Sequence, residues 1–209
     1  MGILRRTSHV VPLADLTQEA RCQVIEQARQ LAIRGSQLDP NLVDHDIALR
    51  PLNGLDLGLG TRGWNETVSA TAGAGIATYE ASAINVGANN AARAERFIVV
   101  YGVHVASSVD SIGSIRWVIG GARTHEWDLQ AILADEPFRQ PRADRTMFVY
   151  PTPGDWIDPP QIPTRTSVLL EHYVRGGTAV GIQPSELVLL GWVAEPIGGG
   201  GAGLHAPGG

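Results

Sequence analysis

The residues of this chain that could support metal chemistry are three histidines, His104, His125 and His172, which fall in three different predicted strands. If these strands close into a barrel, the imidazoles could converge in its interior, and three imidazoles suit zinc or iron. The alternative is that each is an isolated strand histidine, hydrogen-bonded or half exposed. We adopt this alternative and predict no metal site and no cofactor.

A cupin-like metal enzyme is the enzymatic alternative, because the cupin fold is a small jelly roll and the turn Pro153-Gly154-Asp155 is similar to turns in cupin barrels. Cupins bind metal through two histidines one residue apart, a carboxylate and a distant histidine. Here Gly102 and Ala106 flank His104 where a second histidine would stand. The cluster Asp44-His45-Asp46 could be drawn as a separate metal site, but adjacent strand residues point to opposite faces and no further ligand cluster stands nearby.

Acidic residues that could act as a glycosidase pair are numerous, but their spacing selects no pair. Such an enzyme needs two facing carboxylates. The candidates in predicted strands and loops are Glu80, Glu126, Asp128, Asp155 and Glu171. The sequence has no G-x-S-x-G elbow and no Walker loop, and Gly73-Ala74-Gly75 lacks the third glycine of a dinucleotide loop. We therefore predict no catalytic or cofactor-binding residues and no enzymatic activity.

Tryptophans offer a different kind of chemistry, because indole rings can stack on sugars. The five are Trp64, Trp117, Trp127, Trp156 and Trp192. Trp117, Trp127 and Trp192 sit in strand patterns and are expected to fill the core. Trp156 lies in the proline-rich loop PTPGDWIDPPQIP, residues 151–163, where it could contact a partner. A carbohydrate-binding β-sandwich module therefore remains an alternative function.

Positioning these residues requires a β framework, and its clearest part is residues 95–121. Alternation there predicts two strands joined by a polar turn. The first strand places Phe97, Val99, Tyr101, Val103 and Val105 on one face, and the second alternates Ile115, Trp117 and Ile119 with Arg116 and Val118.

Further strands are predicted at 66–72, 75–82, 122–129, 146–150, 167–175 and 187–194, about eight in all. Strands without interleaved helices favour an antiparallel sandwich. We predict a mainly β protein with an eight-stranded, jelly-roll-like antiparallel β-sandwich, with an immunoglobulin-like sandwich as the alternative.

The N-terminal region is predicted to contain an extended arm and one amphipathic helix over residues 18–34. Thr17 is a plausible N-cap, and Gly35 is placed to end the helix. The apolar stripe, which includes Val24 and Ala28, must pack on its own domain or on another subunit. Cys22, the single cysteine, is expected to be a small buried residue.

Four segments follow from these patterns. Residues 1–35 form the arm and helix. Residues 36–65 form a loop-rich linker, in which the alternating Leu52, Leu55, Leu57 and Leu59 could form a short edge strand. Residues 66–196 form the β-sandwich domain. Residues 197–209 form a glycine-rich tail that cannot bury apolar area.

Composition narrows the classes of partner. Charged residues make up 18% of the chain, against about 25% in typical proteins. The net charge is −5, so no overall basic field attracts nucleic acid. No apolar run is long enough to span a membrane, and residues 1–12 lack a signal-peptide core. We expect a soluble protein that acts inside a cell or within a particle released by lysis.

The closing strands carry a resemblance to a known class of protein. SVLLEHYVRGGTAV and SELVLLGWVAEP, residues 167–180 and 185–196, are similar in style to the last strands of bacteriophage capsid-associated and decoration proteins. With the arm, the β domain, the proline-rich loops and the low charge, residues 90–196 resemble structural proteins of icosahedral viruses.

The resemblance implies a virion structural protein, a decoration or minor capsid subunit assembled in the host cytoplasm. It implies a homo-oligomer, with a trimer favoured, that contacts other capsid proteins and neither nucleic acid nor membrane. Residues 1–35 and the loop 151–163 are the expected inter-subunit contacts.

Overall fold

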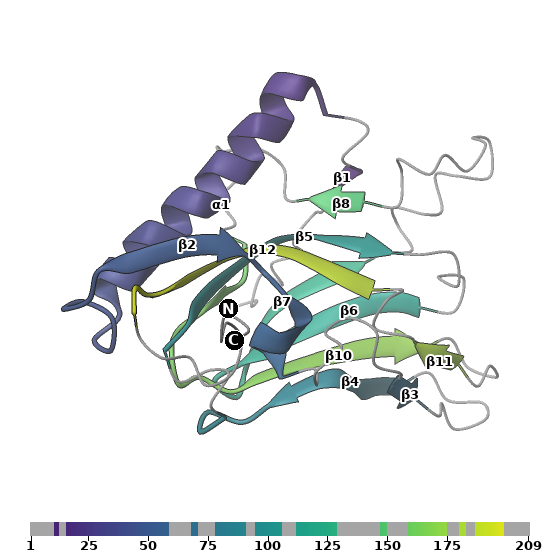
Figure 1. The fold of residues 1–209 in the computed structure, drawn as a ribbon. Coiled ribbons are helices and arrows are strands. Elements are labelled where there is room, and N and C mark those ends of the chain that lie inside the picture. Colours follow the sequence, from purple (N-terminus) through teal and green to yellow (C-terminus); the bar gives the residue numbers. More distant parts are fainter. Residues whose placement is uncertain are drawn as a thin grey trace, which may run out of the picture.

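The structure is a computed structural model that describes residues 11–12, 16–58, 68–70, 78–90, 95–105, 112–128, 147–149, 159–174, 180–182 and 187–198. Within these ranges the protein is mainly β, with two larger antiparallel sheets and one N-terminal helix (Figure 1). The mainly β prediction with a preceding helix is therefore confirmed. The described residues contain no helix that is long and apolar enough to cross a membrane.

The first sheet has the strand order β1-β8-β5-β12-β2, and β9 also pairs with β5. Its strands are β1 Val11–Pro12, β2 Ile47–Pro51, β5 Phe97–Val105, β8 Met147–Val149, β9 Gln161–Ile162 and β12 Leu187–Pro196. The second sheet has the order β4-β10-β6-β7. Its strands are β4 Thr78–Val86, β6 Ile112–Ile119, β7 Ala122–Asp128 and β10 Val168–Val174, and a separate pair joins β3 Val68–Ala70 to β11 Val180–Ile182.

Helix α1, Gln18–Leu38, lies on the outer face of the first sheet, and the second sheet lies on the opposite side (Figure 1). The Thr17 hydroxyl caps the helix by accepting a hydrogen bond from the Ala20 N–H at 3.2 Å, as predicted. The buried residues of α1 recur every four positions; they are Val24, Ala28, Ala32 and Ser36. Ala28 and Ala32 share one buried cluster with Phe97 and Val99 of β5 and Ala194 of β12. The helix therefore packs on its own chain, which is the first of the two predicted arrangements.

Gly35 does not end the helix, so that prediction was wrong. The helix continues through it to Leu38, and the N–H of the C-cap residue Asp39 bonds the Ser36 carbonyl at 3.3 Å. A Cβ at position 35 would collide with the ring of Phe97. Glycine is therefore needed at position 35 because the helix lies close to the sheet there. From the sequence alone, such a glycine cannot be told apart from one that ends a helix.

Alternation in the strands agrees with the sequence pattern. In β5, Phe97 and Val99 contact the helix cluster, and the intervening Ile98 is fully buried on the other face. In the second sheet Trp117 and its register partner Leu170 are fully buried. Both sheets thus contribute apolar faces to buried cores on period two, as expected for strands.

The hairpin between β6 and β7 is closed by Gly120 and Gly121, whose φ angles are +59° and +81°. A two-residue hairpin turn with positive φ at both positions matches the right-handed twist of the flanking strands. Glycine adopts these angles without steric cost. The predicted division between the two strands at this point is correct.

Residues 36–58 are more regular than the predicted linker. The strand in this region is β2, which pairs with β12 at the end of the first sheet, whereas residues around Leu55 form a short 3₁₀ helix, η2 Gly54–Leu57. The strand expected around Leu52, Leu55 and Leu57 was therefore wrong, because β2 ends at Pro51 and the capped 3₁₀ helix follows it. The placement of Cys22 was also wrong, because it is exposed on the outer side of α1.

Several predictions fall outside the described residues. They concern residues 1–10, most of the tail 197–209, residues 151–158 of the proline-rich loop, and Trp64. The boundaries of the four segments and the count of eight strands remain predictions.

Candidate functional site

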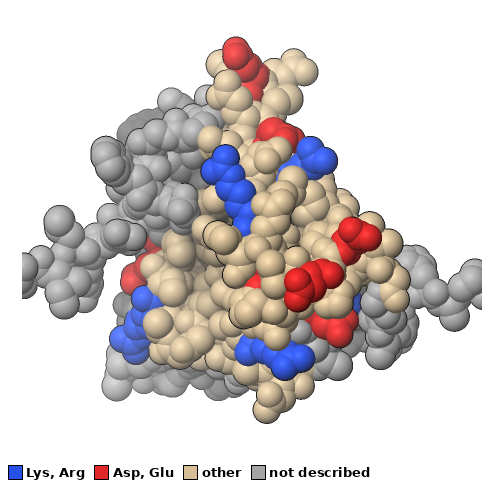
Figure 2. Space-filling model, turned by 90° about the vertical axis from the view of Figure 1, so that its left-hand side faces the viewer, with Lys and Arg blue, Asp and Glu red and all other residues tan. Residues whose placement is uncertain are grey.

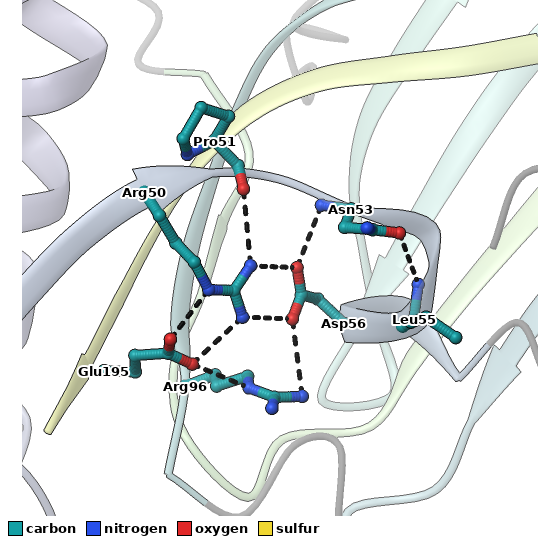
Figure 3. A network of polar contacts seen from close by, with 7 residues as sticks. All are labelled: Arg50, Pro51, Asn53, Leu55, Asp56, Arg96 and Glu195. Carbon is teal, nitrogen blue, oxygen red and sulfur yellow. Dashed lines mark hydrogen bonds and ion pairs between the residues drawn. The ribbon is translucent and has the colours of Figure 1, made fainter. Parts of the chain in front are cut away.

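The most developed polar site in the described structure is a network of four charged residues from four separate elements (Figure 3). Arg50 lies on β2, Asp56 in η2, Arg96 directly before β5, and Glu195 near the end of β12. Sheet register brings the last two together, because Ala194 pairs with Phe97, the residue after Arg96. We call these four residues the charge network.

Arg50 is the centre of the charge network. Its Nη1 and Nη2 donate to Asp56 Oδ2 at 2.8 Å and Oδ1 at 2.6 Å, which is a bidentate pair. Its Nε and Nη2 donate to Glu195 Oε1 at 2.7 Å and Oε2 at 2.9 Å. One guanidinium therefore joins both carboxylates.

Arg96 closes the network from the other side. Its Nε donates to Glu195 Oε2 at 3.1 Å, and its Nη1 lies 3.3 Å from Asp56 Oδ1 (Figure 3). Each carboxylate therefore faces two guanidinium groups, and the formal charges within the network sum to zero.

Burial makes these contacts matter for stability. The Asp56 side chain is 1% exposed and that of Arg96 is 12% exposed, whereas Arg50 and Glu195 are about one-third exposed or less. A buried carboxylate is costly unless it is paired and hydrogen-bonded. The hydrogen bonds that Arg50 donates to Asp56 raise the pKa of Arg50, and those that Arg50 donates to Glu195 lower the pKa of Glu195. Arg50 and Glu195 are therefore held in their charged forms.

Local sequence explains how Asp56 reaches this position. Asn53 caps η2 by accepting a hydrogen bond from the Leu55 N–H at 3.2 Å, and the Asn53 N–H donates to Asp56 Oδ2 at 2.9 Å. This reciprocal arrangement is a capping box. Gly58, with φ at +73°, ends the turn, and Leu57 beside Asp56 is fully buried. The turn folds the carboxylate inward beneath β2.

A second polar cluster ties the end of α1 to the segment after β9. Asp39 accepts hydrogen bonds from the Thr164 N–H at 2.8 Å and the Thr164 hydroxyl at 2.7 Å, and from the Asn41 N–H at 3.0 Å. Burial raises the pKa of Asp39, but the hydrogen bonds from Thr164 and Asn41 outweigh it and leave the pKa below its usual value. Asp39 thus joins segments 125 residues apart in the chain.

The candidate acids lie mostly in the second sheet. Glu171 receives a hydrogen bond from Arg116 Nε at 2.6 Å, and Glu126 is the register partner of Arg116 on β7. The two acids are thus in register with one arginine, an arrangement typical of a cross-strand ion pair. Glu80 pairs in register with His172, Asp128 pairs with Ser114, and Asp155 lies outside the described residues.

The three candidate histidines are distributed over both sheets. His104 is in β5, whereas His125 and His172 are in β7 and β10 of the second sheet. Asp44, His45 and Asp46 are exposed in the turn before β2. Among the described residues no three histidine, cysteine or acidic residues form a group that could hold a metal ion.

The tryptophans follow the prediction where their side chains are described. Trp117 is fully buried, and Trp192 is partly buried against the cluster beneath α1. Trp156 and the side chain of Trp127 lie outside the described residues, so the sugar-stacking hypothesis remains a prediction.

Sequence reasoning missed the charge network entirely. Its members stand at positions 50, 56, 96 and 195, and only pairing of β2 with β12 and of β12 with β5 brings them together. The one local signal is the three-residue spacing between Asn53 and Asp56, which is the spacing of a capping box. That spacing predicts a helical turn but not its charged partners.

Comparison with known proteins gives no relative: no protein-family model, no curated protein and no solved structure matches the chain.

Proposed function

We propose that this protein is a structural subunit of a virus particle, a decoration or minor capsid protein that contributes to assembly and stability and catalyses no reaction. It acts as a homo-oligomer, with a trimer favoured, and contacts other capsid proteins within the virion. The finer architecture belongs to the same proposal: an eight-stranded, jelly-roll-like sandwich that serves as the body of the subunit.

The observation that carries the proposal is a group of exposed large apolar side chains at one end of the molecule. Leu38 is 84% exposed, Val43 57% and Ile197 66%. Leu38 ends α1, Val43 is in the following turn, and the Ile197 N–H bonds the Asp46 carbonyl at 2.7 Å, so these segments adjoin. We call Leu38, Val43 and Ile197 the apolar end patch.

Exposed apolar residues that occur singly need no explanation, but a group of them on adjoining segments favours a contact surface. Figure 2 views the molecule from this side, and uncharged residues make up most of the described surface there. A protein-protein interface has an apolar core and a polar rim. Here the exposed acids Asp44 and Asp46 follow Val43 in the same turn, as residues of a rim would.

The charge network favours a structural role over acid–base catalysis. A general acid or base must gain and lose a proton near the working pH. In the charge network the Glu195 carboxylate and Arg50 are instead held in their charged forms by one another. The arrangement is suited to fixing the edge of a sheet, which is what a rigid building block requires.

The test is analysis of particles purified from the organism that encodes the protein. The protein is expected in a fixed copy number per particle, and the Leu38→Ser, Val43→Ser double variant is expected to incorporate poorly while remaining folded. An Asp44→Ser variant, exposed in the same turn, is the matched control and is expected to incorporate normally. Stoichiometric bound metal, or a glycan whose binding falls in Trp156→Ala, would contradict the proposal.

Residues 1–35, one of the two expected contact regions, include part of the buried core. Deleting residues 1–35 would remove Val24, Ala28 and Ala32 from the buried core along with the arm. Such a deletion is expected to unfold the protein rather than to report on assembly. The informative deletion removes residues 1–12 and leaves α1 intact.

A further inference from the structure

We propose that β1 is an exchangeable strand, so that in the oligomer Val11 and Pro12 of one copy pair with β8 of a second copy. This inference rests on the proposed function, because it requires a second copy nearby. The site is the outer edge of β8, and its ligand is an extended segment of an identical chain. Addition of a strand to an exposed sheet edge is a common mode of recognition between chains.

The pairing itself is seen within one chain. β1 runs antiparallel to β8, with Val11 opposite Val149 and Pro12 opposite Phe148, at the end of the first sheet (Figure 1). The same backbone groups of β8 can accept this strand from any copy, because the register depends only on the local sequence of the two strands.

The pairing is too short to hold the arm firmly by itself. β1 has two residues, whereas strands in globular proteins usually have three to ten. Pro12 has no N–H, which leaves one residue of β1 able to donate to the ladder. Release of β1 from β8 of its own chain therefore costs little free energy, and pairing with β8 of a neighbour restores the same contacts.

The chain allows the strand to reach a neighbour. Five residues, 13–17, separate β1 from α1, and five extended residues span roughly 17 Å. α1 is anchored on its own sheet by a buried stripe, so the anchor stays in place whichever copy receives β1. Exchange of a terminal element between identical subunits is a low-cost route to oligomers.

Charge favours docking of this arm on the body of another copy. Residues 1–12 contain Arg5 and Arg6 and no acidic residue, giving a formal charge of +2. The remainder of the chain has a formal charge of −7, since the total is −5. Opposite charge steers association between the arm of one copy and the body of the next.

Cysteine pairing between separate chains tests the exchange. The exposed native thiol is removed first by Cys22→Ser. One chain then carries Val11→Cys and the other Val149→Cys, residues that are directly opposite in register and within disulfide reach. The two chains are co-expressed, purified and oxidised. The expected product on a non-reducing gel is a crosslinked dimer, at twice the 22.2 kDa mass of the chain.

Controls separate exchange from the alternatives. Each single variant alone is expected to stay at the monomer mass, and so is a co-expressed pair of Val11→Cys with Phe148→Cys, because residue 148 faces the other side of the sheet. A chain carrying both Val11→Cys and Val149→Cys reports pairing within one copy. If only this double variant crosslinks, and it stays at monomer mass, the exchange is overturned. Absence of any crosslink would overturn the β1–β8 pairing and the exchange with it.

Failure of the exchange is distinguishable from failure of the proposed function. Light scattering on the same samples gives the mass of the non-covalent species. An oligomer without crosslinks between chains removes the exchange and leaves the structural role intact, whereas a monomer removes both.

Discussion

The two edges of the first sheet are built differently. At one edge the five-residue strand β2 pairs along β12, and the charge network ties it to η2, β5 and β12. At the other edge the two-residue strand β1 pairs with β8. The comparison shows that one edge strand of a sheet can be held by buried ion pairs, whereas the other is held only by a short backbone ladder.

The two edges differ in the free energy that release of the edge strand costs. An open sheet edge presents unpaired N–H and C=O groups that can pair with other chains. At the β2 edge, release of the strand would leave the buried Asp56 carboxylate without its bidentate partner Arg50, which is costly. At the β1 edge, release costs only the two-residue ladder with β8, worth about 1 kcal/mol or less in all.

The largest effect is expected from breaking the charge network at Asp56. Asp56→Asn keeps the shape but removes one of two negative charges that face Arg50 and Arg96. Because the side chain is buried, we expect a loss of about 3 kcal/mol in the free energy of unfolding, measured by urea denaturation. Glu26→Gln, which alters an exposed pair with Arg29, is the control and should leave the urea midpoint unchanged. Equal stability of the two variants would show that the network does not fasten the β2 edge.

The next largest loss of stability is expected from a substitution where β12 pairs with β2. Gly191 lies at a bulge, and its carbonyl accepts a hydrogen bond from the Leu52 N–H at 2.9 Å. A Cβ there would lie 2.6 Å from the Val99 carbonyl oxygen and 2.9 Å from Leu52 Cδ2. Gly191→Ala is therefore expected to cost about 2 kcal/mol in thermal or urea unfolding. Gly87→Ala, where a Cβ meets no atom within 4 Å, is the control.

A third, graded effect is expected from acid. The pKa of Glu195 is lowered on folding, chiefly by the hydrogen bond from Arg50, and that of Asp39 is lowered despite burial. A carboxyl whose pKa is lower in the folded state stabilises above its unfolded pKa and loses this contribution as pH falls through the folded value. The free energy of unfolding should therefore be level near neutral pH and fall below about pH 4.5.

The pKa of Arg50 shifts in the opposite direction, upward on folding. Its raised pKa contributes stability at every pH below the pKa of the unfolded state, which is strongly basic, so it adds no slope in the acid range. Urea titrations at a series of pH values measure the profile. A stability that rises as the pH drops from 5 to 3 would be incompatible with the charge network as described.

The smallest effect on stability is expected at the β1 edge. Deletion of residues 1–12 removes β1 and keeps all the buried core residues that the structure describes, which run from Val24 to Ala194. We expect the free energy of unfolding to change by about 1 kcal/mol or less, since only a short ladder is lost. The same deletion should lower the oligomer mass in light scattering. A large loss of stability with an unchanged mass would mean that β1 belongs firmly to its own chain.

The sequence predicted what depends on local periodicity. Alternation in residues 97–105 and 115–119, the Thr17 cap and the Gly120-Gly121 turn all have local physical causes, and all are present. Burial of Trp117 and Leu170 also follows from period two once the strands exist.

The rest depends on contacts between distant segments. Gly35 has the sequence signature of a helix end, yet the Phe97 ring 62 residues later requires glycine there within the helix. Arg50 and Glu195 carry no local sign of being partners, because their pairing arises from sheet register across 145 residues. The apolar end patch was likewise missed, since Leu38 and Ile197 become neighbours of the same turn only in the folded chain.

The molar mass of the purified protein in solution tests the structural role most directly. Multi-angle light scattering is predicted to give a multiple of the 22.2 kDa chain mass, with three copies favoured, and Leu38→Ser combined with Val43→Ser should shift it toward a single copy. A wild-type protein that remains at 22.2 kDa at all concentrations, and whose mass the double variant does not change, would contradict the account.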